Sequence, residues 1–180
     1  FFGIKVLKDR QQFEVFAALQ VTATPKSQVY LNGTLLGETP YSSDKLKPGE
    51  QTIKIVPLES SSNFFEQKVK LVPLLLTVID RTFRANEAQN EGLILTLEEL
   101  PDKNVTELVF MSSPREAKVF LDNDLKGITP LSLKEIPVSD HEINLSLPGF
   151  IDKRTRVKIS SGYKLIADFK LAVSMGASPS

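Results

Sequence analysis

The feature that most restricts the fold of this sequence is a repeat with a spacing of 90 residues. The segment Val29–Pro40 aligns without gaps with Val119–Pro130, and six of the twelve positions are identical. The same offset places Ile53 on Ile143. Because self-similarity at a fixed spacing indicates a repeated structural unit, the sequence predicts two copies of one small domain.

Turn residues within each copy predict β-hairpins. Asn32-Gly33 is expected to form a two-residue type I′ turn, which requires positive φ at both positions. Asp122-Asn123-Asp124 takes the same place in the second copy, with residues that tolerate the left-handed region. The further shared turn positions are Gly37 and Pro40 in the first copy and Gly127 and Pro130 in the second. We expect the two glycines of this set to hold a conformation or a close approach that a Cβ would disturb.

Most of the remaining sequence carries the signal of β-strands. Apolar and polar residues alternate in segments 65–71, 142–147 and 154–159, which is typical of strands with one buried and one solvated face. The one helical signal is a single turn at residues 85–90. Apolar residues make up 41% of the chain, enough to form a core. The predicted fold class is therefore all-β, with two tandem small β-sandwich domains of the same type.

The predicted boundary between the two copies is the polar turn at residues 101–104. An apolar strand at residues 93–97 is expected to close the first copy. The first sandwich is then expected over residues 19–100 and the second over residues 104–173. Residues 174–180 are small and polar, which is typical of a linker.

A set of strand and turn residues in each copy points to a family. In the first copy they are Pro25, Val29-Tyr30-Leu31-Asn32-Gly33, Gly37, Thr39-Pro40 and Pro48-Gly49-Glu50. In the second copy they are Pro114, Ala117, Val119-Phe120-Leu121-Asp122, Gly127, Thr129-Pro130 and Pro148-Gly149-Phe150. Over residues 19–173 the chain resembles the PEGA domain family. The resemblance implies a small β-sandwich of extracytoplasmic and cell-surface proteins in bacteria and archaea, often in tandem behind a membrane anchor, with no catalytic residues to carry over.

Composition excludes several kinds of chemistry. The chain has no Cys, so disulfides, thiolate zinc sites and thiol nucleophiles are absent from its chemistry. Lys and Arg number 22, as do Asp and Glu, which gives no electrostatic reason to expect a nucleic-acid partner. A single His leaves little room for acid–base catalysis. We therefore predict no catalytic residue, no cofactor and no metal site.

Two residues are candidates for chemistry. His141 lies between Asp140 and Glu142, but neighbours on a strand point to opposite faces, and the first copy has Gln51 at this position. We expect His141 to be an exposed turn histidine with no nucleophile or carboxylate converging on it. Asp122 begins a segment that resembles a calcium loop, but that loop fails at its fifth and twelfth ligand positions, so hairpin chemistry is the preferred interpretation.

Two surfaces are candidates for binding. One is the loop that ends in Phe64 and Phe65, and the other is the strand face formed by Arg154, Arg156 and Lys158. The basic face would suit an anionic envelope polymer, but a solvated outer face that discourages edge pairing is the preferred interpretation. Aromatic rings exposed in a shallow groove would favour glycan binding, whereas buried rings would favour a spacer.

The beginning of the chain bears on location. The first residue is Phe1, not Met, so we expect the chain to be a piece of a longer protein. The segment 1–18 is open to two interpretations, a juxtamembrane segment behind an anchor outside the chain or a first strand. The longest apolar run, Leu71–Ile79, has nine residues and falls short of the roughly 20 that span a bilayer. No spanning segment or signal peptide is expected inside the chain.

These expectations favour a non-enzymatic module outside the cytoplasmic membrane. It would serve as a spacer or as a binding and adhesion element of a membrane-anchored cell-envelope protein. The alternative is a carbohydrate- or envelope-polymer-binding module, and an enzyme is the third class. The expected partners are a cell-envelope protein or a glycan, with no nucleic acid, and with the membrane only through an anchor outside the chain.

Overall fold

The computed structural model describes residues 14–60 and 62–176 and contains fifteen strands and one short 3₁₀ turn in this part of the chain. In the first half the elements are β1 (Ala17–Thr24), β2 (Ser27–Leu31), β3 (Thr34–Glu38), β4 (Tyr41–Leu46), β5 (Gly49–Pro57), β6 (Phe65–Leu71), β7 (Leu76–Thr82), η1 (Glu87–Gln89) and β8 (Glu91–Glu99). In the second half they are β9 (Glu107–Ser113), β10 (Lys118–Leu121), β11 (Asp124–Ile128), β12 (Leu131–Lys134), β13 (Asp140–Ser146), β14 (Lys153–Lys158) and β15 (Tyr163–Lys170). Within the described residues, no helix has the length and apolar character needed to cross a membrane.

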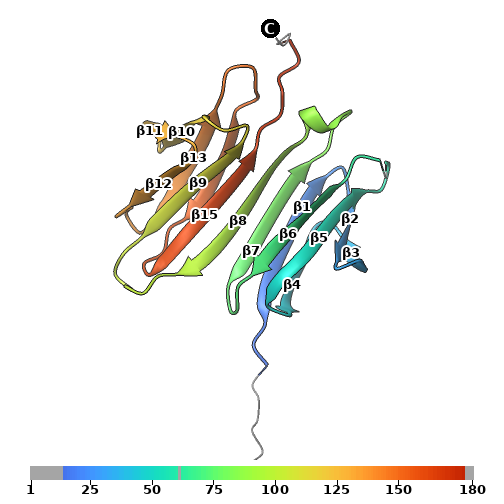
Figure 1. Ribbon diagram of the computed structural model, residues 1–180, viewed down its shortest axis with the longest axis horizontal. Helices are drawn as coiled ribbons and strands as arrows, with labels where there is room; N and C mark the ends of the chain where they lie inside the picture. Colours follow the sequence, from blue (N-terminus) through green and yellow to red (C-terminus); the bar gives the residue numbers. More distant parts are fainter. Residues whose placement is uncertain (1–13, 61, 177–180) are drawn as a thin grey trace, which may run out of the picture.

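The strands form one long sheet and two short ones (Figure 1). The long sheet has seven strands in the order β12-β9-β15-β8-β7-β1-β4, and the short sheets have the orders β3-β2-β5-β6 and β11-β10-β13-β14. Strands β1 to β7 and strands β9 to β15 follow one topology, since β7 pairs parallel with β1 as β15 does with β9. The predicted fold class, an all-β pair of similar sandwiches, is confirmed.

The aligned hairpins have the same local geometry. Asn32 and Gly33 have φ of 48° and 83°, and Asp122 and Asn123 have φ of 52° and 70°, so both turns have the positive pair that type I′ requires. A β-bulge follows at the same place in each hairpin, where the register of β2 with β3 and of β10 with β11 shifts by one residue. In the described part of the chain, four Pro residues that follow Thr or Ser have cis peptide bonds: Pro25, Pro40, Pro114 and Pro130.

The repeated threonine has a structural task that sequence patterns did not reveal. Thr39 Oγ1 accepts a hydrogen bond of 3.0 Å from the backbone N–H of Ser27, and both side chains are buried. Thr129 Oγ1 accepts the equivalent bond of 3.1 Å from the N–H of Ala117. Each threonine thus satisfies a buried backbone donor where its chain crosses from one sheet toward the other.

Strand β8 takes part in both sandwiches. It pairs antiparallel with β7 over five residues and with β15 over eight. Leu93 belongs to the core of the second unit, whereas its neighbour Ile94 belongs to the core of the first. Because successive side chains on a strand point to opposite faces, the two short sheets must cover opposite faces of the long sheet.

The structure differs from the sequence expectations in the place of one strand and in the burial of one core residue. The apolar segment 93–97 was expected to close the first copy, but it lies between the copies and joins them. The core positions Val29, Val119 and Leu121 are buried as expected, whereas Leu31 is only partly buried. The segments 1–13 and 177–180, parts of the expected N-terminal arm and C-terminal linker, lie outside the described residues.

The bulge glycines lead to a stability prediction. A Cβ on Gly127 would lie 3.1 Å from Leu131 Cδ1 on a backbone with φ of 156°, so we expect Gly127→Ala to reduce the free energy of unfolding by about 1 kcal/mol or more. Gly37→Ala should cost less, because the nearest atom there, Tyr41 Cδ2, is 3.4 Å away. Urea unfolding measures both losses. The exposed neighbour Lys126→Ala is the control, and a loss as large as that of Gly127→Ala would contradict the explanation.

Candidate functional site

The expectation that His141 is exposed is wrong. The residue is 6% exposed, because β13 begins at Asp140 and the next position faces inward, opposite Val157 of β14. Asp140, the neighbouring carboxylate in the sequence, lies on the other face, as expected. A more distant carboxylate, Asp122, reaches the imidazole instead.

Three groups converge on the imidazole of His141. Its Nδ1 lies 2.6 Å from Asp122 Oδ2, and its Nε2 lies 2.9 Å from Ser139 Oγ and 2.8 Å from the carbonyl oxygen of Pro137. The arrangement has the residue types of a Ser-His-Asp triad. A base in such a triad needs an unprotonated Nε2 to accept the serine proton. Here a carboxylate and a carbonyl, which only accept, face the two nitrogens, so the doubly protonated imidazolium satisfies both contacts.

The surroundings of the imidazole favour this cationic form. Burial lowers the pKa of His141, but the hydrogen bonds to Asp122 and to the Pro137 carbonyl, with the nearby charges of Asp122 and Asp140, outweigh burial and raise the pKa above 6.5. The backbone N–H of Glu142 and the imidazole lower the pKa of Asp122. None of the main cavities along the described chain is lined by His141. In this cationic form the imidazole is not a free base.

The first copy has the same contacts with different side chains, which explains what this cluster does. Asn32 Nδ2 donates to Gln51 Oε1 at 2.5 Å, and Gln51 Nε2 donates to the carbonyl of Lys47 at 3.0 Å. Asn32 Oδ1 also accepts from the N–H of Thr52 at 2.8 Å, as Asp122 Oδ1 does from Glu142 at 2.9 Å. The Asp122–His141 pair is thus the second copy's version of a clasp between the hairpin turn and the start of the next strand. In the part of the chain that the structure describes, no three metal-ligating side chains gather.

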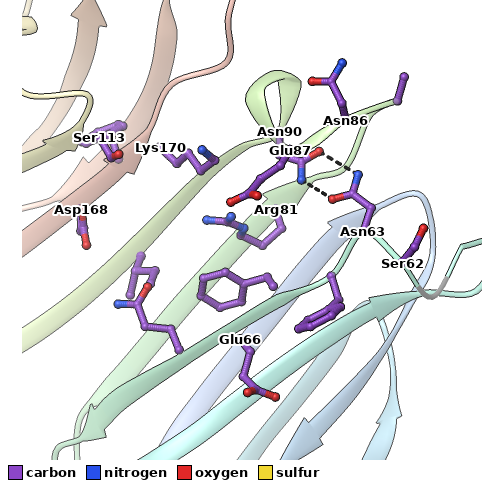
Figure 2. A pocket seen from close by; sticks show the side chains of 16 residues that line it. Ser62, Asn63, Glu66, Arg81, Asn86, Glu87, Asn90, Ser113, Asp168 and Lys170 are labelled. Carbon is purple, nitrogen blue, oxygen red and sulfur yellow. Dashed lines mark hydrogen bonds between the residues drawn. The ribbon is translucent and has the colours of Figure 1, made fainter.

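A groove lies between the two units in the described part of the chain (Figure 2). We call it the inter-unit groove. It encloses about 820 Å³ and is bounded by the edge strand β6, by β7 and β8, and by β15 of the second unit. It exists because the short sheet that ends at β6 covers only part of one face of the long sheet. Gln67, at an inward position in the middle of β6, is exposed for the same reason.

A buried arginine occupies the centre of the inter-unit groove. Arg81 is 8% exposed, with the ring of Phe65 4.1 Å from its Cζ. On the opposite strand Gly92 leaves the space that the guanidinium fills, since a Cβ there would lie 2.7 Å from Arg81 Cζ. Arg81 Nε is buried and has no hydrogen-bond partner, and burial lowers the pKa of this group to about 10.

Two charged side chains of β15 face Arg81 across the groove. Figure 2 shows Asp168 and Lys170 pointing into the same space as the guanidinium. Burial raises the pKa of Asp168, and the charge of Arg81 lowers it in part. No ion pair within 4.0 Å joins Arg81 to a carboxylate of the described residues. The guanidinium of Arg81 and the carboxylate of Asp168 therefore remain available to a ligand.

The rim of the groove is held by a hydrogen-bond network. The side-chain amides of Asn63 and Asn90 bond to each other in both directions, at 2.6 Å and 3.2 Å. Asn90 Oδ1 also accepts from the N–H of Arg84 at 2.9 Å. The network fixes the loop before β6 to the turn before β8, and so fixes the position of Phe64 and Phe65.

The predicted surface residues fall in two separate places. Phe64 and Phe65 both line the inter-unit groove, but Phe65 is buried under Arg81 whereas Phe64 is 45% exposed with Lys54 Nζ 4.3 Å from its ring centre. The second place is β14, the edge strand of the second short sheet, which carries the exposed side chains of Arg154, Arg156 and Lys158. Arg154 Nη1 lies 3.6 Å from Glu142 Oε1.

The groove residues Arg81, Asp168 and Lys170 were missed because strands far apart in sequence bring them together. One signal was present in the sequence. Arg81 stands at an inward position between Ile79 and Phe83, where alternation predicts an apolar residue.

Comparison with known families agrees with this architecture. The model of the PEGA domain matches residues 16–71 and 105–173, more than half of the chain. The chain belongs to the PEGA domain family. The two matches correspond to two PEGA units, and PEGA domains are a family of non-catalytic modules. Searches of curated proteins and of solved structures found no match.

The clasp of the second PEGA unit predicts a pH-dependent stability. His141 has a raised pKa in the folded state, so its stabilisation is present below pH 6.5 and is lost as the pH rises through the folded value. Asp122 has a lowered pKa, so its stabilisation is present above pH 3.8 and is lost as the pH falls through the folded value. We therefore expect the free energy of unfolding to fall as the pH rises above 6.5 and His141 loses its proton.

The first PEGA unit supplies the control. The double variant Asp122→Asn/His141→Gln recreates the amide pair of Asn32 and Gln51, and its unfolding free energy should change less across this pH range. Urea unfolding at several pH values measures the difference. The only His of the chain also gives an isolated NMR signal, which should titrate above pH 6.5. Equal pH dependence in both proteins would show that the clasp is not responsible.

Proposed function

We propose that this PEGA pair is a non-catalytic spacer that holds its two ends at a fixed separation within the extracytoplasmic part of a cell-envelope protein. The observation that carries the proposal is the sharing of β8. A flexible linker between domains leaves their orientation free, but here β8 is hydrogen-bonded to strands of both units. A continuous sheet resists bending at the joint far better than a linker does.

Side-chain contacts on the other face of the joint support the same function. Lys153 Nζ of the second unit lies 3.1 Å from Asp80 Oδ2 and 3.7 Å from Glu91 Oε1, and its side chain is only 13% exposed. A partly buried cation between two carboxylates fixes the units more firmly than an exposed pair does. In Figure 1 the chain enters β1 at one side of the sheet and leaves after β15 at the opposite side, as a spacer requires.

The absence of catalysis is part of the proposal. The three residue types of a hydrolase triad meet at His141, but Nε2 is held by the Pro137 carbonyl and no main cavity of the described chain reaches it. The location outside the cytoplasmic membrane and an anchor beyond this chain rest on the family resemblance. A cell-envelope protein or glycan is the partner that this location suggests.

A second function is favoured by one observation, the inter-unit groove. It presents the half-exposed ring of Phe64 beside polar and charged side chains, which is a common lining of ligand sites. We propose binding of an envelope polymer in this groove as a function that a rigid spacer can also perform. The basic stripe formed by Arg154, Arg156 and Lys158 on β14 is a weaker candidate, because it lies on an open edge strand and lines none of the main cavities of the described residues.

Rigidity is tested by distances between spin labels. The chain has no Cys, so Ser42→Cys in the first unit and Ser160→Cys in the second give two unique labelling sites, both exposed. We expect the distance distribution between them to be as narrow as that of a pair within the first unit, Thr34→Cys with Ser42→Cys. A broad distribution for the pair across the joint, with a narrow one for the control, would rule out the spacer.

Location is tested in the full-length protein that carries this module. With Ser42→Cys, a membrane-impermeant maleimide added to intact cells or spheroplasts should label the protein, because the site lies outside the cytoplasmic membrane. The parent protein without the substitution gives the background. Labelling that requires lysis of the cells would place the module in the cytoplasm and contradict the proposal.

A further inference from the structure

We propose that the inter-unit groove binds an acidic saccharide, with the sugar carboxylate on Arg81 and Lys170 and neighbouring hydroxyls on Asp168. This names the ligand class of the polymer-binding function proposed above and rests on that function, not on the spacer role. The argument concerns the charged groups of the groove, their fixed positions and the space between them.

Arg81 is prepared for a planar anion. Its guanidinium is held between the Phe65 ring and the backbone of Gly92, so little side-chain freedom is lost when a ligand binds. Arg81 lacks an ion-pair partner among the described residues although it is nine-tenths buried. A guanidinium donates two parallel hydrogen bonds to a carboxylate or a phosphate, and such charge-assisted bonds are stronger than neutral ones.

The other charges of the groove restrict the anion. Lys170 adds a second cation, but Glu66, Glu87 and Asp168 also line the groove, so a doubly charged phosphate would meet repulsion from three carboxylates. A ligand carboxylate carries a single negative charge and meets less repulsion from these side chains. Asp168 remains as a hydrogen-bond acceptor, and hydroxyl groups are the donors that satisfy it without adding charge. A ligand with one carboxylate and adjacent hydroxyls matches this set.

Space and walls favour a saccharide over a small acid. The groove volume of about 820 Å³ lies within the range of about 300–1,000 Å³ found for ligand sites. The exposed part of the Phe64 ring offers an apolar surface to the C–H face of a sugar ring. The amide pair of Asn63 and Asn90 holds that ring in place before the ligand arrives.

The test uses trigalacturonate and its fully methyl-esterified form, in which an uncharged methyl ester replaces each carboxylate, in titration calorimetry with the whole chain. We expect trigalacturonate to bind and the ester to bind about tenfold more weakly or not at all. Arg81→Lys keeps the charge and the stem but loses the planar fork, and it should weaken binding by about tenfold or more. Lys170→Gln, at a half-buried position, should also weaken binding, and it decides the matter if Arg81→Lys unfolds the protein.

The control variant is Lys158→Gln on the basic stripe, which should leave the affinity unchanged. Loss of binding in Lys158→Gln, with normal binding in Lys170→Gln, would place the ligand on the stripe and overturn the inference. Equal affinity for the methyl ester would overturn it too, while leaving polymer binding in place. If neither trisaccharide binds but the chain is retained on isolated wall polymer, the ligand class is wrong and the function stands. If the trisaccharides do not bind and the chain is not retained on wall polymer, both the inference of an acidic saccharide and the polymer-binding function are wrong.

Discussion

The structure depends on the pairing of one strand, β8, with both units. Residues of β8 alternate between the two cores, so the strand can be buried on both faces only when the second unit is present on one side and the first on the other. This places the two short sheets on opposite faces of the long sheet. The first short sheet ends at the edge strand β6 and leaves the part of the long sheet around Arg81 uncovered on that face. The inter-unit groove is a direct consequence of this joint.

The two copies show how one backbone geometry accepts different chemistry. The clasp that ties the hairpin turn to the following strand uses two neutral amides in the first unit, Asn32 and Gln51, and an ion pair in the second, Asp122 and His141. Distances and partners are nearly the same, but only the second pair changes charge near neutral pH. The presence of Ser139 beside the imidazole makes the second clasp look like a catalytic triad. The first unit shows that the geometry serves the fold, since amides perform the same task there.

Sequence patterns reached the fold class, the repeat and the hairpin turns because each depends on local rules. Positive φ at Asn32-Gly33 and period-two alternation require no knowledge of the other strands. The position of His141 could have been obtained too, because its alignment with Gln51 and its alternation with Ile143 both place it inward; its polar neighbours suggested the opposite. The role of β8 and the meeting of Arg81 with Asp168 were out of reach. They depend on which strands pair across the joint, and an apolar strand carries no signal that it has two partners.

The two faces of the joint differ in how a buried cation is balanced by nearby carboxylates. On the face covered by the second unit, Lys153 from the edge strand β14 lies between Asp80 and Glu91, so its charge is balanced and the units are fastened. On the face covered by the first unit, Arg81 points into the space beside β6 and no carboxylate of the described chain comes within ion-pair distance. Removing a charge from water without a partner costs stability, so an unpaired Arg81 is the less stable of the two arrangements. The opposite face of the joint is fastened by ion pairs, whereas Arg81 lies buried without an ion-pair partner of the described chain in the inter-unit groove. This difference is why we propose binding in the groove beside β6.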